Sequence, residues 1–477
     1  MTFDSYEYLF VFLPLVFVLY QCVRNSALHN WVLVGASLFF YGWGDPYLIL
    51  LLLFVSSQDY IIGKLIANSS NQRWRTALIV FSVGTNLLLL SLFKYGDWLI
   101  DVWNRFNGAE LIPLFHRDMS LMKMSLPLPI GISFYTFHTI SYTVDIYRRQ
   151  MVPKTSFIDY LSFVSFFPLL VAGPIQRASH LLPQIARLRP CVSFRNAEYA
   201  LFLIFWGLMK KMVFADNLGK LVERCQENMA ASGAGIVLAY AFCFQIYFDF
   251  SAYTDIARGS AKLFNIRLTK NFLTPYFARS PSEFWHRWHI SLSTFLRDYL
   301  YIPLGGNRKG AIRTYVNLMV TMTLGGLWHG AGIFFILWGI YHGVMLCLYR
   351  AVPFETFLER KFKAPGRVLA TLIMFHITVF GWVLFFSKPD TFQPIYQSIV
   401  ASFSGLGDGV PQLFWGLALF TVPLIFTEVL GYRRDREFID LYPRLKLHYR
   451  VLLYVLIFYA IVFFGRRTGY AFIYFQF

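Results

Sequence analysis

The chain of 477 residues is 57% hydrophobic and only 14% charged, with 51 Phe, 29 Tyr and 12 Trp. This composition excludes an ordinary soluble protein, because soluble chains carry about a quarter of charged residues. The formal net charge of +17 is explained by membrane lipids with anionic headgroups and by basic cytoplasmic loops, so nucleic acid is not an expected partner.

Apolar windows of about 20 residues recur along the chain, and each is long enough to cross roughly 30 Å of hydrocarbon. We predict an all-α polytopic membrane protein with about 11 or 12 transmembrane helices, plus interfacial or re-entrant ones. No soluble domain or internal repeat is found, so residues 1–477 are expected to form a single integral membrane domain. The apolar segments are 7–23, 30–43, 46–66, 76–95, 127–146, 157–176, 198–215, 233–252, 312–329, 333–350, 367–387, 411–430 and 448–465.

Charges in the first loops indicate the orientation of the chain. Arg24, Lys64 and Arg149 lie in alternate loops, and the turn at Asp45 between two of them is acidic. Because basic loops stay in the cytoplasm, the N-terminus is expected on the outer side. Asp4 precedes the first apolar run where a signal peptide would carry a basic residue, so no cleavable signal is predicted.

Polar residues interrupt the apolar segment 233–252. Gln245 and Asp249 are four residues apart and therefore share one helix face. The carboxylate either orients a histidine or pairs with Arg258 or Arg267, and a purely structural pair is the simpler interpretation.

A helix is predicted over 281–301. It begins after Ser280, which is followed by proline at the first helical position and by glutamate at the third. Trp285 and His289 fall on its apolar face, and His286 on its flank. The two histidines lack a third ligand at helical spacing, and the five cysteines are scattered, so no metal site is predicted.

The next polar segment is the turn GGNRKG, residues 305–310. Glycine-rich backbone with Arg308 and Lys309 suits the phosphates of a donor, although an ordinary basic turn explains the same residues. The spacing differs from that of a Walker A loop.

Trp328 and His329 lie in the sequence LGGLWHGAG, between two apolar segments. A buried imidazole without a partner costs a few kcal/mol, so His329 either makes a structural hydrogen bond or marks a site at membrane depth. Only a helix broken at 325–326 or at Gly330 would place it deep. The chain has no GxSxG, HExxH or GxGxxG motif, so no bound cofactor is expected.

Taken together, these residues resemble a known family. SEFWHRWHISLSTFLRDYLYIPLGGNRKG and LGGLWHGA are similar to the signature of the membrane-bound O-acyltransferases (MBOAT). The similarity is closest to the bacterial alginate O-acetylation (AlgI-like) branch, related to the teichoic-acid D-alanylation proteins (DltB). FFPLLVAGPIQR, YFDFSAYTDIARG and the terminal FIYFQF extend it over most of the chain. The resemblance implies a ring of helices around a central tunnel, with His329 at its narrowest point and His289 as the second catalytic histidine.

The resemblance also implies a function. Such an enzyme takes an acetyl group from a cytoplasmic donor such as acetyl-CoA, and passes it across the bacterial inner membrane. A periplasmic acetyltransferase then modifies an exported polysaccharide. Transfer from a thioester to a hydroxyl needs a base with a pKa near neutral, as histidine has, and a site without water. Trp328, Trp285, Asp249 and Gln245 are expected to support or line that site.

Two other functions are compatible with a polytopic membrane protein. A transporter of a lipid-linked sugar or acyl donor would perform no chemistry, but many transporters contain internal repeats, and none is found here. A lipid acyltransferase of the same superfamily is disfavoured by the AlgI-like motifs.

Overall fold

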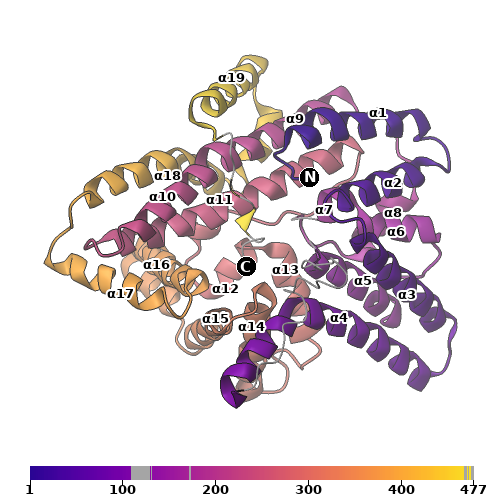
Figure 1. Ribbon diagram of the computed structural model, residues 1–477, viewed down its shortest axis with the longest axis horizontal. Helices are drawn as coiled ribbons and strands as arrows, with labels where there is room; N and C mark the ends of the chain where they lie inside the picture. The colour runs from indigo at the N-terminus through magenta and orange to yellow at the C-terminus, as the bar shows by residue number, and fades with distance from the viewer. Residues whose placement is uncertain (109–128, 130, 171–172, 467–469, 471, 474–477) are drawn as a thin grey trace. The chain divides into compact units, whose positions relative to one another are not determined.

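The computed structural model describes the chain except for residues 109–128, 130, 171–172, 467–469, 471 and 474–477 (Figure 1). Helices account for 77% of it, and the described residues contain no strand. The predicted all-α fold is therefore confirmed. The helices form two compact units, Met1–Ile204 with Ile256–Thr269, and Phe205–Asp255 with Lys270–Phe477.

In the first unit, α3 (Leu48–Asn68) packs against α4 (Gln72–Asn107) and α5 (Ile132–Tyr147). Among them lies the buried carboxylate of Asp59, which accepts a hydrogen bond of 2.7 Å from Asn86 Nδ2. A polar group inside the bundle is thus satisfied by a neighbouring helix. The other helices are η1 (Glu7–Phe12), α1 (Leu13–Val23), α2 (His29–Tyr41), α6 (Phe157–Ser165), α7 (Phe167–Leu170), α8 (Ala178–Ala186) and the first part of α9 (Phe194–Met209).

The second unit contains most of the buried helix α11 (Ala234–Leu263) and a helical hairpin. The hairpin is formed by α14 (Ala311–His329) and α15 (Ile333–Ala351), which lie side by side (Figure 1). α16 (Phe354–Phe386) packs on α15. The remaining helices are η2 (Lys210–Ala215), α10 (Asp216–Glu227), η3 (Pro275–Phe277), α12 (Pro281–Arg287), α13 (Ile290–Leu296), η4 (Arg297–Tyr301), α17 (Phe392–Ala401), η5 (Ser402–Ser404), α18 (Val410–Tyr432), η6 (Phe438–Arg444) and α19 (Leu447–Phe464).

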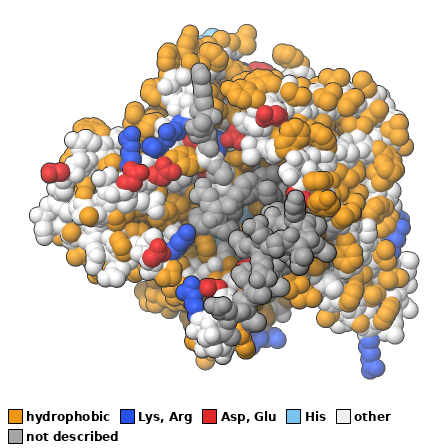
Figure 2. Space-filling model, in the orientation of Figure 1, with side chains coloured by type: hydrophobic (Ala, Val, Ile, Leu, Met, Phe, Trp, Pro, Cys, Tyr) orange, Lys and Arg blue, Asp and Glu red, His pale blue; other side chains and the backbone are white. Residues whose placement is uncertain are grey.

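Several helices have the length and the surface of membrane spans. Figure 2 shows hydrophobic side chains over much of the visible surface of the first unit, at the right of the view. Long apolar helices with such a surface are those of a multi-pass membrane protein. The total of about 11 or 12 crossings stays a prediction. The described helices that are long and apolar enough to cross a membrane number seven: α3, α4, α11, α15, α16, α18 and α19.

One predicted span is interrupted. The continuous helix expected over 157–176 is wrong, because α6 ends at Ser165 and Phe166 leaves the helical conformation (φ −50°, ψ 108°). Pro168 follows, and proline, which lacks an N–H, fits only the first turn of a helix. The chain therefore starts the new helix α7 at this point.

Candidate active site

The segment that carries His289 is also broken. The single helix predicted over 281–301 is wrong, because α12 and α13 are separate helices and His289 joins them in the left-handed conformation (φ 42°, ψ 53°). That conformation costs about 1–2 kcal/mol for a residue other than glycine. A main-chain hydrogen bond of 2.9 Å from the Ile290 N–H to the oxygen of Asn271 supports the turn.

The break places the His289 ring inside the second unit, where its side chain is fully buried. Its Nδ1 lies 3.0 Å from Oδ1 of Asn271. The ring meets Phe250 edge to face, with centroids 4.7 Å apart, and its centroid is 6.2 Å from that of Trp328. Burial lowers the pKa of His289 to about 3, so the imidazole is neutral near neutral pH.

His329 is the last residue of α14. The helix passes Gly325 and Gly326 without a break, and the chain turns at Gly330 (φ −164°, ψ 162°) before α15 begins. Of the two break points considered from the sequence, the structure therefore has the one at Gly330. The turn leaves the His329 side chain buried, with 5% of its surface exposed.

Aromatic rings surround His329. The centroid of its ring lies 5.0 Å from that of Trp328, 5.1 Å from that of Trp338 and 5.2 Å from that of Phe385. Trp328 contacts both motif histidines, since its ring also faces His289. These rings form an apolar wall around the imidazole.

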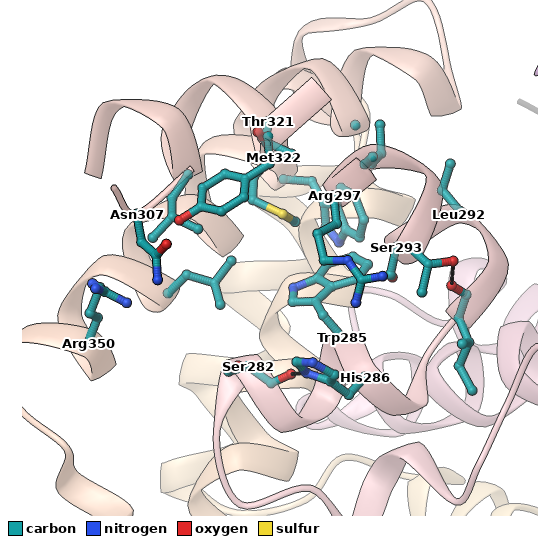
Figure 3. Close-up of a pocket in the computed structure, with 18 of the residues that line it drawn as sticks. Ser282, Trp285, His286, Leu292, Ser293, Arg297, Asn307, Thr321, Met322 and Arg350 are labelled. Atoms are coloured by element: carbon teal, nitrogen blue, oxygen red, sulfur yellow. Dashed lines mark hydrogen bonds between the residues drawn. The ribbon is translucent and has the colours of Figure 1, made fainter. Parts of the chain in front are cut away.

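His329 lines a cavity of about 440 Å³ that lies within the second unit (Figure 3). The walls come from α12, α13, η4 and the hairpin of α14 and α15. Trp285 of α12, Leu292 of α13 and Met322 of α14 converge on it from three helices. The cavity thus brings Trp285 and His329 together, whereas His289 is not among its lining residues.

Exposed polar residues also line the cavity, and we call the end that holds Asn307 and Arg350 its mouth. Arg297, Asn307 and Arg350 are exposed, and Figure 3 shows Asn307 and Arg350 together at one end. The Arg297 guanidinium also donates a hydrogen bond of 2.7 Å to Asp298. Guanidinium groups bind phosphate with matching geometry, so the cavity connects a basic, exposed mouth to a buried histidine.

His286 lies at another part of the cavity wall. Its Nδ1 is 2.6 Å from the carbonyl oxygen of Ser282, and Figure 3 shows the two residues together. Because a carbonyl oxygen only accepts, Nδ1 carries the hydrogen in this contact. No role is predicted for this histidine from the sequence.

The glycine-rich turn lies beside the mouth. Arg308 and Lys309 are exposed and do not line the cavity, whereas the preceding residue, Asn307, does. The aliphatic part of the Lys309 side chain lies against Gly305.

Asp249 and Gln245 lie away from the cavity lining. The Asp249 carboxylate pairs with Lys211 at 3.0 Å and accepts the N–H of Ile473 at 2.8 Å. Lys211 belongs to η2, a π-helical turn that brings two consecutive lysines into the interior. Gln245 lies against Gly219 of α10. The sequence did not suggest Lys211 as a partner, because it is distant along the chain.

Sequence reasoning missed several residues of this region. Asn271 and Arg350 belong to no motif, and they come near the site only through the packing of separate segments. Arg297 lies in the motif of residues 282–310, but no periodic signal sets it apart. Trp338 lies beside His329 on the facing helix of the hairpin, and only an expectation that α14 and α15 pair could have found it.

The structure thus combines a polytopic helical fold with a buried histidine, an aromatic wall and a cavity with exposed arginines, an arrangement suited to a membrane-bound group-transfer enzyme. The chain belongs to the MBOAT, membrane-bound O-acyltransferase family, whose model matches residues 147–387. The matched segment contains Asn271, both motif histidines and the cavity lining. The protein is thus an O-acyltransferase.

Relatives of known name support this membership. The protein named "Probable alginate O-acetylase AlgI" of Pseudomonas aeruginosa is 38% identical over 413 residues, which cover 85% of this chain and 75% of that protein. The "Peptidoglycan O-acetyltransferase" of Helicobacter pylori is 36% identical, with 81% and 77% covered. The "Teichoic acid D-alanyltransferase" of Bacillus subtilis is more distant, at 26% identity over 59% of this chain and 76% of that protein.

Proposed function

We propose that this membrane O-acyltransferase takes an acetyl group from a cytoplasmic thioester donor and passes it across the membrane for O-acetylation of an exported polysaccharide. The whole chain acts as one membrane domain in the bacterial inner membrane, with its N-terminus in the periplasm. The observation that carries the proposal is the cavity that joins exposed Arg297 and Arg350 to buried His329. The names of the relatives, which act on alginate and on peptidoglycan, support a glycan as the final acceptor.

His329 is the proposed general base. Its imidazole takes the proton from an acceptor hydroxyl as the hydroxyl oxygen attacks the thioester carbonyl carbon. The carbon–sulfur bond then breaks, the acetyl group forms an ester with the acceptor, and the thiol leaves with the proton that the imidazole returns. Trp328, Trp338 and Phe385 exclude the water that would hydrolyse the thioester. His289 is a second proposed catalytic residue, which accepts a hydrogen bond from the acceptor.

The proposed donor is acetyl-CoA. Its thioester end reaches His329 through the cavity. Its phosphates bind the exposed guanidinium groups of Arg297 and of Arg350, which lies at the mouth. Arg308 and Lys309 add positive charge outside the lining and contribute less. Trp285 lines the acyl path, whereas Gln245 and Asp249 support the helices around it.

His329→Asn tests the proposal. Asparagine keeps polarity but is no base, so we expect ester-linked acetate on the exported polysaccharide to fall at least about 100-fold at normal protein levels in the membrane. His448→Asn, which changes an exposed histidine on α19, is the matched control and should leave acetylation intact. Full acetylation by His329→Asn would contradict the proposal, and would favour a transporter that performs no chemistry.

A further inference from the structure

The side-chain oxygen of Asn271 receives three hydrogen bonds. Asn271 is fully buried, and its Oδ1 lies 3.2 Å from the Ser291 N–H, 2.8 Å from Ser291 Oγ and 3.0 Å from His289 Nδ1. A main-chain N–H only donates, so the amide atom facing it must be the oxygen and not the nitrogen. The His289 Nδ1 that meets the same oxygen therefore carries a hydrogen.

This contact decides the chemistry of the other ring nitrogen. A neutral imidazole has one N–H, so a hydrogen on Nδ1 leaves a lone pair on Nε2. Within the part of the chain that the structure describes, buried Nε2 has no hydrogen-bond partner. Burial also keeps the ring neutral, because it lowers the pKa of His289 to about 3. Nε2 thus carries an acceptor lone pair that no described group uses, on a ring that is fully buried and does not line the cavity.

We propose that Asn271 is a positioning residue that holds His289 as the Nδ1–H tautomer, so that Nε2 accepts a hydrogen bond from the hydroxyl of the acyl acceptor. This inference rests on the proposed function, in which His289 acts on that hydroxyl. It assigns a role to a residue outside both histidine motifs. Without the Asn271 oxygen, the hydrogen could move to Nε2, and the nitrogen that meets the hydroxyl would become a donor.

The main chain allows this role to be separated from a structural one. The left-handed turn at His289 is supported by the Asn271 main-chain oxygen, which accepts the Ile290 N–H at 2.9 Å. Any residue at position 271 keeps this oxygen, so a side-chain substitution removes the contact with Nδ1 and leaves the main-chain bond.

Two substitutions test the proposal, one that removes the side-chain acceptor at position 271 and one that keeps it. Asn271→Leu keeps the branched shape of the side chain but has no acceptor, so kcat for acetyl transfer in membranes of cells that make the polysaccharide should fall about 10–100-fold, with an unchanged KM for acetyl-CoA. Asn271→Asp keeps the acceptor and adds a negative charge, which raises the pKa of His289. It should keep activity at alkaline pH, while the acid limb of its kcat profile moves to higher pH by at least about one unit.

The control is Asn86→Leu, which removes another buried asparagine, in the first unit. A structural loss should reduce the amount of folded protein but not kcat per folded molecule. NMR of protein with ¹⁵N-labelled histidine reports the tautomer directly. The signal of the non-protonated Nε2 of His289 is assigned by its absence in His289→Asn, and it should shift in Asn271→Leu.

The outcomes separate the proposal from its premise. If His289→Asn is inactive while both Asn271 variants keep the wild-type kcat and pH profile, the positioning role is wrong and the function of His289 stands. If His289→Asn is fully active, the role of His289 itself fails, and that of Asn271 with it.

Discussion

At the scale of single residues, the two motif histidines differ in what surrounds them. His329 lines the cavity and is enclosed by aromatic rings, whereas His289 is fully buried and hydrogen-bonded through Nδ1 to Asn271. In the proposed function His329 meets the donor, and the ring of Trp328 contacts both histidines. The same residue type is therefore prepared for two tasks by its neighbours.

The buried, neutral state of His289 makes stability depend on pH. Its pKa is about 3 in the folded protein and 6.5 when unfolded, so its contribution is complete above pH 6.5 and is lost as the pH falls below that value. The loss at pH 5.5 should be about 1.4 kcal/mol in the free energy of unfolding. Asparagine tolerates the left-handed turn, so His289→Asn should fold. On acidification in detergent, its free energy of unfolding should fall by about 1.4 kcal/mol less than that of the wild type. His448→Asn should behave as wild type, and an equal loss in both variants would contradict the prediction.

Arg350 tests the mouth of the cavity. Arg350→Glu reverses the charge beside Asn307, so we expect the KM for acetyl-CoA to rise about 10-fold, with a smaller change in kcat. The Arg308→Ala and Lys309→Ala pair, outside the lining, should have a smaller effect.

The matched control is Arg367→Glu, which reverses the charge of an exposed arginine on α16. An unchanged KM in Arg350→Glu, or an equal rise in Arg367→Glu, would show that the mouth does not bind the donor phosphates.

At the scale of elements, the site depends on the close approach of α14 and α15. A methyl group on Gly326 would lie 2.3 Å from the main-chain oxygen of Phe335 and 2.9 Å from Gly339. Both contacts are with main chain, which cannot yield as a flexible side chain does. The glycines therefore set the spacing that lets Trp338 of α15 reach His329 of α14.

Gly326→Ala should separate the two helices and lower the free energy of unfolding by about 1–3 kcal/mol, with a further loss of activity as the aromatic wall opens. The measurement is thermal unfolding in detergent together with acetylation in cells. Gly84→Ala on α4, where nothing lies within 4 Å, should be neutral or slightly stabilising. Equal stability of both variants would contradict this account of the hairpin.

At the scale of the whole molecule, the longest connection predicted on the outer side lies between the apolar segments 76–95 and 127–146. α4 continues as a helix to Asn107 and takes up the first part of this connection, and residues 109–128 lie outside the described residues. Roughly 30 residues are in any case fewer than the roughly 40 at which an unaided fold becomes plausible. An extended glycan needs a larger cleft, so we expect a periplasmic acetyltransferase to complete the transfer.

Purified protein supplied with acetyl-CoA and the polysaccharide alone should therefore give no acetylated glycan. Mass spectrometry of the polysaccharide is the measurement, and membranes from cells with the complete set of polysaccharide-modifying proteins are the positive control. Efficient product formation by the purified chain would overturn the need for a partner.

The fold class, the family and several helix ends were determined by the sequence alone. Apolar segments predicted the all-α membrane fold, because a chain in lipid must satisfy its backbone hydrogen bonds within helices. The paired histidine motifs predicted the family, because a specific order of residues is visible without a structure. The ends of α14, α15 and α18 fell within one or two residues of the predicted bounds, since glycine, proline and charged residues mark them.

Only the tertiary structure decided how these parts form a site. The turn at His289 breaks a helix that local signals favoured, because Asn271, from a separate segment, supplies the hydrogen bond that supports it. Trp338 lies beside His329, and Arg350 lines the same cavity, only because α15 folds back on α14. Asp249 forms an ion pair with Lys211 because a π-helical turn points that lysine inward. Such partners are distant along the chain, and periodicity reports which face of a helix is apolar but not which residue it will meet.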